Sequence, residues 1–531
     1  MNSLAVAALL SACLHADPVS KSAGKPSASV PVADAQALAG RVDRLIRDAL
    51  AAAKVASAPQ SDDATFFRRI HLVLAGRPAT PEALSKFLAD PDPRKRAKAI
   101  EGLLASKDST EHFVGIWRGW LIPEADTNAD IAGNVPAFEF WLREKLSKRT
   151  PYDQFVKELL TVSMNSRLAM NRPADGEGAA PAANPLAWYL AKEAKPENLA
   201  AAASRTFLGL QLECAQCHDH PTAKWSRDQF WGTAAFFGGI ERAGGNGLRE
   251  VLERREMAIP SAFRTVQATF LDDREPVWRY KQSARVAFAD WVIAKDNPFF
   301  AKAAVNRIWG YLFGVGLVDP IDAFDDKNPP SHPELLDELA RSFVAANYDL
   351  RYLIEAIVLT EAFQRSSALS YPGQEDARKY ARFTMQGQSP EQLAAGLTLL
   401  LGPKPEKKVD PRQPVQPETA GPSKEFRETF ALGGKRTESQ TTILQALALM
   451  NGTQTAEALD LLSSKLYRDS LDAKVPLSER IDRIYLAVLN RKIKPDELTK
   501  VTAYVAAGKE KERIADLLWV LLNSLEFRTI H

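Results

Sequence analysis

Residues 512–527 read ERIADLLWVLLNSLEF, and this stretch displays the pattern that sets the fold class. Its apolar residues recur every three or four positions and form one stripe, which consists of Ile514, Leu517, Leu518, Leu521, Leu522 and Leu525. Charged residues at positions 512, 513 and 516 fall outside the stripe. A period near 3.6 residues is the mark of an amphipathic helix that packs on a core. The stretch therefore predicts a helix with one buried face.

The same helical period runs along most of the chain from residue 35 onward. Near its start the period is kept by five apolar residues, Leu38, Val42, Leu45, Ile46 and Leu50. The exception is the segment 244–274, which mixes glycine, charged residues and short apolar patches. We therefore expect a mostly α protein of two helical domains, with a small irregular or β-containing insert between them that holds the strands.

Two segments of the chain resemble each other at one fixed offset. Arg69-Ile70-His71-Leu72, followed by Arg77 and Pro81, recurs as Arg483-Ile484-Tyr485-Leu486, followed by Arg491 and Pro495. A looser third copy runs from residue 307 to residue 363. We interpret these as related helix-turn-helix units, with both prolines at equivalent positions. Ile70 and Ile484 should be buried, while Lys86 and Lys500 should stay in solvent.

The composition excludes some classes of function. The chain is 45% hydrophobic and 25% charged, which is ordinary for a globular protein. Its 68 Lys and Arg residues against 66 Asp and Glu give a net charge of +2, so no excess positive charge is left for a nucleic acid. No run of about eighteen apolar residues is present, so we expect no membrane-spanning helix.

The N-terminal residues have features of an export signal. Residues 4–12 (LAVAALLSA) form a short apolar run, and residues 10–13 (LSAC) match a lipobox that ends at Cys13, the expected site of lipidation. The positive charges that usually precede such a run are missing, which counts against export. Residues 14–34, rich in Ser, Ala, Pro and Lys, have the composition of a flexible tether. We expect a periplasmic protein or an outer-membrane lipoprotein, held at the membrane only by a lipid anchor.

Chemistry is concentrated in one motif, Cys214-Ala215-Gln216-Cys217-His218. The chain has only three cysteines, and two of them lie here. In a c-type haem site both thiols of CxxCH add to the porphyrin vinyl groups, and the histidine binds the iron. Five aromatic residues follow, Trp225, Phe230, Trp231, Phe236 and Phe237; they are candidates for a wall around the macrocycle, with membership of the core as the alternative.

Other chemistries suit the same residues. Cys214, Cys217, His218 and His220 are four potential ligands for zinc or another divalent metal. Because residues two apart point to opposite sides of a helix, such a site would need a loop. A Cys214–Cys217 disulfide is a further alternative outside the cytoplasm, although no thioredoxin-like pattern surrounds the pair. A hydrolase would use the metal with Asp219 or His220 beside a bound water.

At 531 residues the chain is long enough for more than one core. We predict five segments: a signal or lipoprotein signal at 1–13, a tether at 14–34, a helical domain with CxxCH at 35–243, a linker or insert at 244–274, and a second helical domain at 275–531. The second helical domain should contain a mobile loop at 402–422.

These residues give the chain a clear resemblance. Residues 66–88 (FFRRIHLVLAGRPATPEALSKFL), 207–237 (FLGLQLECAQCHDHPTAKWSRDQFWGTAAFF) and 297–340 resemble the secreted planctomycete cytochrome-like family. Its members link two domains of unknown function, the first with CxxCH and the second called planctomycete-specific domain one. The resemblance implies an exported protein with a covalent haem, and it implies no particular reaction.

The motif and the resemblance together favour one function. We expect an exported protein with one covalent haem c on Cys214, Cys217 and His218, which transfers electrons to a periplasmic redox partner or senses a ligand. The main alternative is a non-redox helical binding or scaffold module with a structural metal at the CxxCHDH site. A metal-dependent hydrolase is the third hypothesis, so whether the protein is an enzyme stays open.

Overall fold

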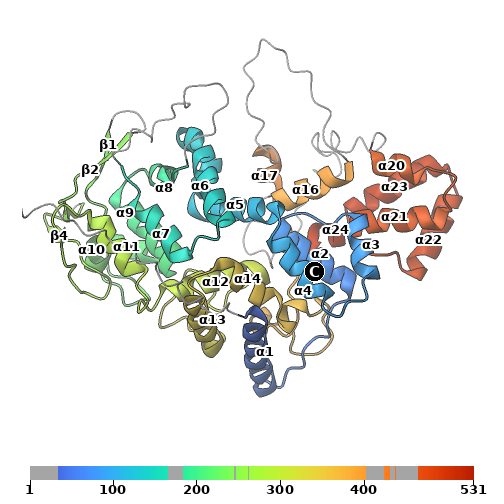
Figure 1. Ribbon diagram of the computed structural model, residues 1–531, viewed down its shortest axis with the longest axis horizontal. Helices are drawn as coiled ribbons and strands as arrows, with labels where there is room; N and C mark the ends of the chain where they lie inside the picture. Colours follow the sequence, from blue (N-terminus) through green and yellow to red (C-terminus); the bar gives the residue numbers. More distant parts are fainter. Residues whose placement is uncertain are drawn as a thin grey trace, which may run out of the picture. The chain divides into compact units, whose positions relative to one another are not determined.

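Helices make up most of the computed structural model, as the apolar period predicts (Figure 1). The structure describes residues 34–164, 183–243, 247–260, 262–401, 424–430, 437 and 464–531. Cys13, the predicted signal segment and the predicted mobile loop 402–422 lie outside these ranges. Ala35–His531 forms one compact unit. The division at 244–274 into two helical domains stays a prediction.

The helices before residue 240 include those that surround the CxxCH segment. They are α1 (Ala35–Ala52), α2 (Asp63–Ala75), α3 (Pro81–Ala89), α4 (Lys95–Leu104), α5 (Lys107–Leu121), α6 (Val135–Ser147), α7 (Tyr152–Thr161), α8 (Leu186–Ala191), α9 (Pro196–Ala203) and α10 (Arg227–Ala235). Short turns of 3-10 helix lie at η1 (Pro123–Asp126), η2 (Ala129–Asn134) and η5 (Leu212–Gln216), and η4 (Ser204–Leu208) is a π-helix. Helix α5 packs on α6, and α9 packs on α10.

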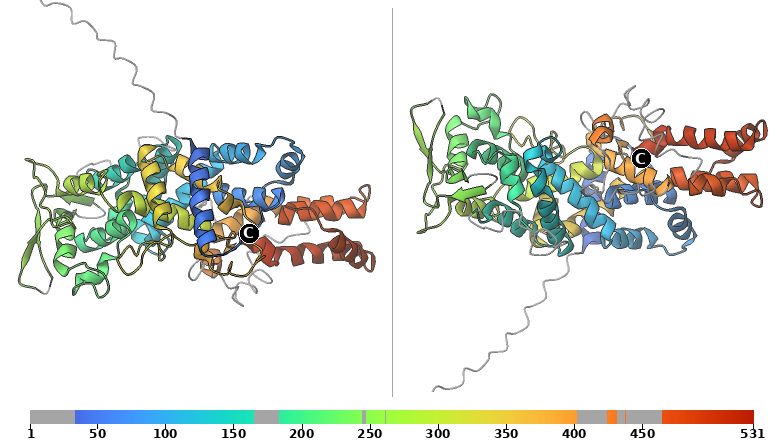
Figure 2. Two further views of the ribbon diagram at one scale, coloured as in Figure 1. Left: turned by 90° about the horizontal axis from the view of Figure 1, so that it is seen from below. Right: turned by 90° about the horizontal axis from the view of Figure 1, so that it is seen from above.

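The later helices pack partly on these and partly on one another. They are α11 (Ala284–Val292), α12 (Phe300–Phe313), α13 (Pro333–Ala345), α14 (Leu350–Val358), α15 (Glu361–Gln364), α16 (Pro390–Leu401), α17 (Lys424–Phe430), α20 (Lys465–Ser470), α21 (Leu477–Leu489), α22 (Pro495–Ala506), α23 (Glu510–Leu522) and α24 (Leu525–Arg528), with a 3-10 turn at η6 (Ala377–Lys379). Helices α21, α22 and α23 pack against each other (Figure 2). In the described ranges no helix is both long and apolar enough to span a bilayer.

The strands are few and short. β1 (Ile240–Ala243) pairs antiparallel with β2 (Gly247–Glu250), and β3 (Glu256–Ala258) pairs antiparallel with β4 (Thr265–Gln267), next to α10 (Figure 1). Three of these four lie inside the predicted insert, as expected. A third pair, β5 (Gln386–Gly387) with β6 (Thr529–Ile530), lies outside it. Two residues per strand are too few to give an alternating pattern, so sequence reasoning missed this pair.

The repeat prediction is confirmed in its main features. Pro81 is the first residue of α3, and Pro495 is the first residue of α22. The preceding helices, α2 and α21, both end at a left-handed residue, Gly76 with φ 68° and Asn490 with φ 54°. Ile70 and Ile484 are fully buried, and Lys86 and Lys500 are exposed. The third copy follows the same order, with Gly314 after α12 and Pro333 opening α13.

Each of the three units ends in the same local structure. Ser106, Thr360 and Ser524 are the N-caps of α5, α15 and α24, and each side chain accepts a hydrogen bond from the backbone N–H three residues on. The prediction of one helix with an apolar stripe from Ile514 to Leu525 is wrong at its end. Helix α23 ends at Leu522, and a new helix begins after the N-cap Ser524. Leu525 therefore leaves the apolar stripe and is 52% exposed.

Two buried arginines of α2 connect these units. Arg68 donates to the carbonyl oxygen of Phe527 over 2.8 Å, at the end of one N-capped turn. Arg69 donates to the carbonyl oxygen of Phe363, at the end of another, and its Nε donates to the carbonyl of His531 over 3.0 Å. Buried carbonyl groups need such donors. Helix α2 is therefore the element on which the ends of the other two units converge.

Candidate functional site

The helical segment before CxxCH ends at Gly209, and this end directs the chain into the turn that carries the cysteines. Helix α9 passes into the π-helix η4, which ends at Gly209 with φ 69°. A Cβ at Gly209 would lie 2.6 Å from the ring of Phe324, so both the conformation and the close approach require glycine. Leu210 and Leu212 are then buried, which fixes the start of η5 in the core.

The two cysteines lie on the surface of this turn. Cys214 is within η5 and Cys217 directly follows it; both thiols are exposed and neither is in a disulfide. Between them Ala215 is fully buried. The indole N–H of Trp231 donates to the carbonyl of Gln216 over 3.0 Å. The buried Ala215 and the hydrogen bond from Trp231 hold the turn against α10. Because the turn is held on that side, both thiols face solvent and can react.

His218 has the tautomer that a metal ligand needs. Its side chain is exposed, and its Nδ1 lies 2.7 Å from the carbonyl oxygen of Asp219. A carbonyl oxygen only accepts hydrogen bonds, so Nδ1 carries a proton, and in the neutral ring Nε2 therefore holds the lone pair. Metal-bound histidines usually show this arrangement, with the second nitrogen donating to a carbonyl or carboxylate.

His220 has the opposite tautomer. Its Nδ1 accepts hydrogen bonds from the backbone N–H groups of Thr222, over 3.2 Å, and Ala223, over 2.9 Å. A backbone N–H only donates, so Nδ1 holds the lone pair and the neutral ring carries its proton on Nε2. The backbone N–H of His220 donates to the carbonyl of Trp225 over 2.8 Å. These hydrogen bonds show that His220 stabilises the turn at 220–225.

Asp219 is also engaged by the local backbone. Its Oδ1 accepts a hydrogen bond from the N–H of Arg227, the first residue of α10, over 2.8 Å. A carboxylate at a helix N-terminus is stabilised by the free N–H groups and the helix dipole. In the part of the chain that the structure describes, no three His, Cys, Asp or Glu side chains are arranged to hold a metal ion. The four side chains of the divalent-metal alternative are thus not brought together there.

A network of charged and polar side chains ties the site to the second half of the chain. Arg205 of η4 pairs with Glu213 and, over 3.3 Å, with Asp322. The side-chain amide of Gln211 donates to Asp322 over 2.8 Å. The buried Arg307 of α12 donates to the carbonyl of Arg205 over 3.0 Å. Partners about a hundred residues apart leave no local pattern, so only the structure could reveal this network.

The five aromatic residues after the motif belong to the core, and the wall around a macrocycle that they were candidates for is not present. All five are buried, at most 6% exposed. Phe236 stacks on Phe270 at 5.2 Å between ring centroids. A small cavity of about 250 Å³ lies beside the segment, lined in part by Lys224 and Trp225. It is below the range of about 300–1,000 Å³ usual for ligand pockets. Two free, exposed thiols and the exposed His218 are residues that would suit covalent attachment of a haem and ligation of its iron.

Comparisons with known proteins identify the family. A model described as protein of unknown function DUF1549 (PSCyt2) matches residues 41–242, and one described as protein of unknown function DUF1553 (PSD1) matches residues 284–432 and 425–505. No curated protein and no solved structure matches significantly. The first match contains the whole CxxCH segment, and the two matches lie on either side of the predicted insert. The chain belongs to the planctomycete family in which these two domains of unknown function are linked.

Proposed function

We propose that this protein is an exported c-type haem-binding protein that transfers electrons or senses a ligand. The observation that carries the proposal is the pairing of two free, exposed thiols with a neighbouring histidine whose Nδ1–H donates to a backbone carbonyl, which leaves Nε2 as the nitrogen that can bind a metal. The tautomers also favour haem over the four-ligand metal site, because His220 would have to give up its backbone hydrogen bonds or its Nε2 proton to become a ligand.

The chain's own residues have distinct tasks in this proposal. Cys214 and Cys217 would hold the haem covalently, each by addition of its S–H across one vinyl group, which requires no oxidant. His218 offers Nε2 to the iron, and the Asp219 carbonyl holds the ring in that tautomer. When bound, haem supplies a one-electron couple, whose potential depends on the axial ligands and on exposure.

The test is expression of the full chain, with export, in a host that has a haem-ligation system. The expected product has a Soret band and keeps its haem through denaturing electrophoresis. Replacing both cysteines (Cys214→Ala with Cys217→Ala) should abolish both signals. A colourless protein with stoichiometric zinc would overturn the proposal and support the structural-metal alternative.

His218 and His220 form a matched pair of variants. His218→Ala should shift the Soret band, because it removes the axial nitrogen. His220→Ala should leave the absorption spectrum as in the parent protein, because that ring serves only the turn. Loss of the axial ligand in the His220 variant, with a normal spectrum for the His218 variant, would refute the assignment of the two tautomers.

Location is a separate part of the proposal. The lipobox that ends at Cys13 and the composition of residues 14–34 support a mature chain that begins at or after Cys13, outside the inner membrane. Mass spectrometry of the purified protein and of membrane fractions should find a lipidated or cleaved N-terminus. An intact Met1 on cytoplasmic protein would contradict export, and would leave the haem without its ligation compartment.

A further inference from the structure

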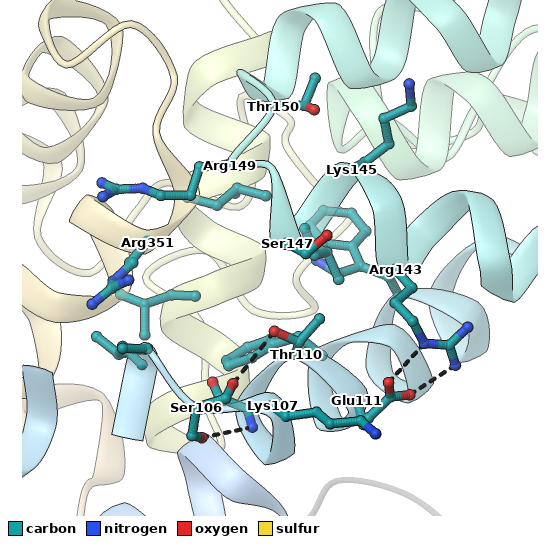
Figure 3. A pocket seen from close by; sticks show the side chains of 18 of the residues that line it. Ser106, Lys107, Thr110, Glu111, Arg143, Lys145, Ser147, Arg149, Thr150 and Arg351 are labelled. Atoms are coloured by element: carbon teal, nitrogen blue, oxygen red, sulfur yellow. Dashed lines mark hydrogen bonds and ion pairs between the residues drawn. The ribbon is translucent and has the colours of Figure 1, made fainter. Parts of the chain in front are cut away.

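A second cavity lies away from the CxxCH segment. Its volume is about 500 Å³, within the range of about 300–1,000 Å³ typical of small-molecule sites. The lining comes from residues 104–117, 143–155 and 349–354, so it is built by the start of α5, the turn between α6 and α7, and the start of α14 (Figure 3). None of these residues belongs to the proposed haem site.

The floor of this cavity is apolar. Phe113, Trp117, Phe155 and Ile354 line it, and each is at most 5% exposed. The rings of Trp117 and Phe155 lie 5.4 Å apart, edge to face, so they support each other in a fixed arrangement. A rigid apolar floor favours a ligand with a ring or another compact apolar body.

The rim of the cavity carries an excess of positive charge. Five lining residues are cationic, Lys107, Arg143, Lys145, Arg149 and Arg351, whereas only Glu111 and Asp349 are anionic. Both carboxylates are already engaged. Glu111 accepts two hydrogen bonds of 2.7 Å from Arg143, and Asp349 pairs with Arg149. Lys145 pairs over 2.6 Å with Glu158, which lies outside the lining.

Two of the five cations, Lys107 and Arg351, are in none of the ion pairs of the described residues, and each has a longer-range charge interaction, with Glu111 and Glu355 respectively. Lys107 is the first residue of α5, where the helix dipole adds positive potential. Arg351 donates one hydrogen bond, of 3.2 Å, to the backbone carbonyl of Glu101. In Figure 3 Arg351 and Arg149 extend along one side of the cavity, and Arg143 and Lys145 lie on the opposite side. Because Arg143, Lys145 and Arg149 are paired with carboxylates, Lys107 and Arg351 are the two cations that a ligand's acidic groups would meet.

We propose that this cavity binds a small organic anion that has an apolar body and two acidic groups, either carboxylates or sulfonate-like groups. The floor would contact the apolar body, and Lys107 and Arg351 would each compensate one negative charge. Charge-assisted hydrogen bonds from guanidinium and ammonium groups are the strongest that side chains make with such oxyanions. The site is independent of haem, so its test does not depend on the haem proposal.

Isothermal titration of the full chain tests this site with three probes: naphthalene disulfonate, the neutral naphthalene diol with the same ring, and inorganic sulfate. The disulfonate should bind at one site per chain, at least about tenfold more tightly than the diol, because two charge-assisted hydrogen bonds are lost with the diol. Sulfate should bind more weakly than the disulfonate because it lacks the apolar body. Affinity for the disulfonate should fall as salt is added.

A double variant and its matched control locate the binding. Lys107→Ala with Arg351→Ala should weaken disulfonate binding by about tenfold or more. Lys465→Ala with Arg483→Ala removes the same charge from exposed positions on α20 and α21 and should leave it unchanged. Absence of disulfonate binding, equal affinity for the diol, or equal losses in both variants would overturn the proposal. If the first variant does not fold, the comparison of the probes on the parent protein decides.

Discussion

Replacing Arg285 by methionine should destabilise the protein strongly, because it leaves a buried carboxylate without its partner. The Arg285 side chain is 2% exposed and that of Glu250 is 8% exposed. Arg285 donates to both oxygens of Glu250, over 2.9 and 2.5 Å, and to the carbonyl of Leu160 and the hydroxyl of Tyr189, each over 3.0 Å. This pair ties strand β2 and α11 to α7 and α8.

The magnitude follows from that burial. Removing one partner of a buried ion pair costs about 3–5 kcal/mol, mostly because the other charge stays buried alone. Arg285→Lys keeps the charge but loses the planar fork, so a smaller loss, of about 1–3 kcal/mol, is expected. In the double variant Arg285→Met with Glu250→Leu no charge is left unpaired. Its loss should therefore be smaller than the sum of the two single losses by about 1–3 kcal/mol.

Urea denaturation, followed by tryptophan fluorescence, measures these free energies of unfolding. Burial raises the pKa of Glu250, but the hydrogen bonds and charge of Arg285 outweigh it, so the pKa lies below its ordinary value of 4.5. A depressed folded-state pKa gives stability that is complete above the unfolded pKa and is lost as pH falls through the folded pKa. The difference between parent and Arg285→Met should thus shrink under acid conditions. A single variant within about 1 kcal/mol of the parent near neutral pH, or losses that add in the double variant, would refute the reasoning.

Three further predictions concern pH, a turn and the site. Burial lowers the pKa of His71 and of His531 from 6.5 to about 4. Each neutral ring should therefore contribute about 3 kcal/mol of stability that is complete above pH 6.5 and is lost progressively as the pH falls to about 4. Stability curves of the parent and of His71→Gln against pH measure the contribution of His71. Asn490→Ala should cost about 2–3 kcal/mol in urea, and Asn490→Gly about 1 kcal/mol less, because φ is 54° and the amide donates to the Ala79 carbonyl over 2.8 Å; equal losses would rule out backbone strain. Gly209→Ala should lower both the melting temperature and haem incorporation, whereas the exposed Gly102→Ala should not lower incorporation.

The features that the sequence predicted correctly depend on neighbours along the chain. The helices follow from the spacing of apolar residues, and Pro81 and Pro495 open their helices because proline suits the first turn. Local pattern is enough for these features because the interactions that produce them span only a few residues.

The burial and the hydrogen-bond partners of individual side chains could not be predicted from local sequence pattern. Arg69 and Arg483 occupy the same position of the repeat, yet Arg69 is fully buried and donates to distant carbonyls, whereas Arg483 pairs with Glu479 at the surface. The difference arises because only α2 has the ends of two other units packed on it. Arg285 and Glu250, thirty-five residues apart, carry no motif either. Such contacts are decided by the tertiary structure.

The five aromatic residues after CxxCH left two interpretations open, a wall around a macrocycle or membership of the core. The structure shows the second, because the segment that contains α10 places all five in the core. The same packing is what holds the motif outward, since Trp231 donates to the Gln216 carbonyl between the two thiols. A group attached at Cys214 and Cys217 would therefore rest on the outside of a filled core.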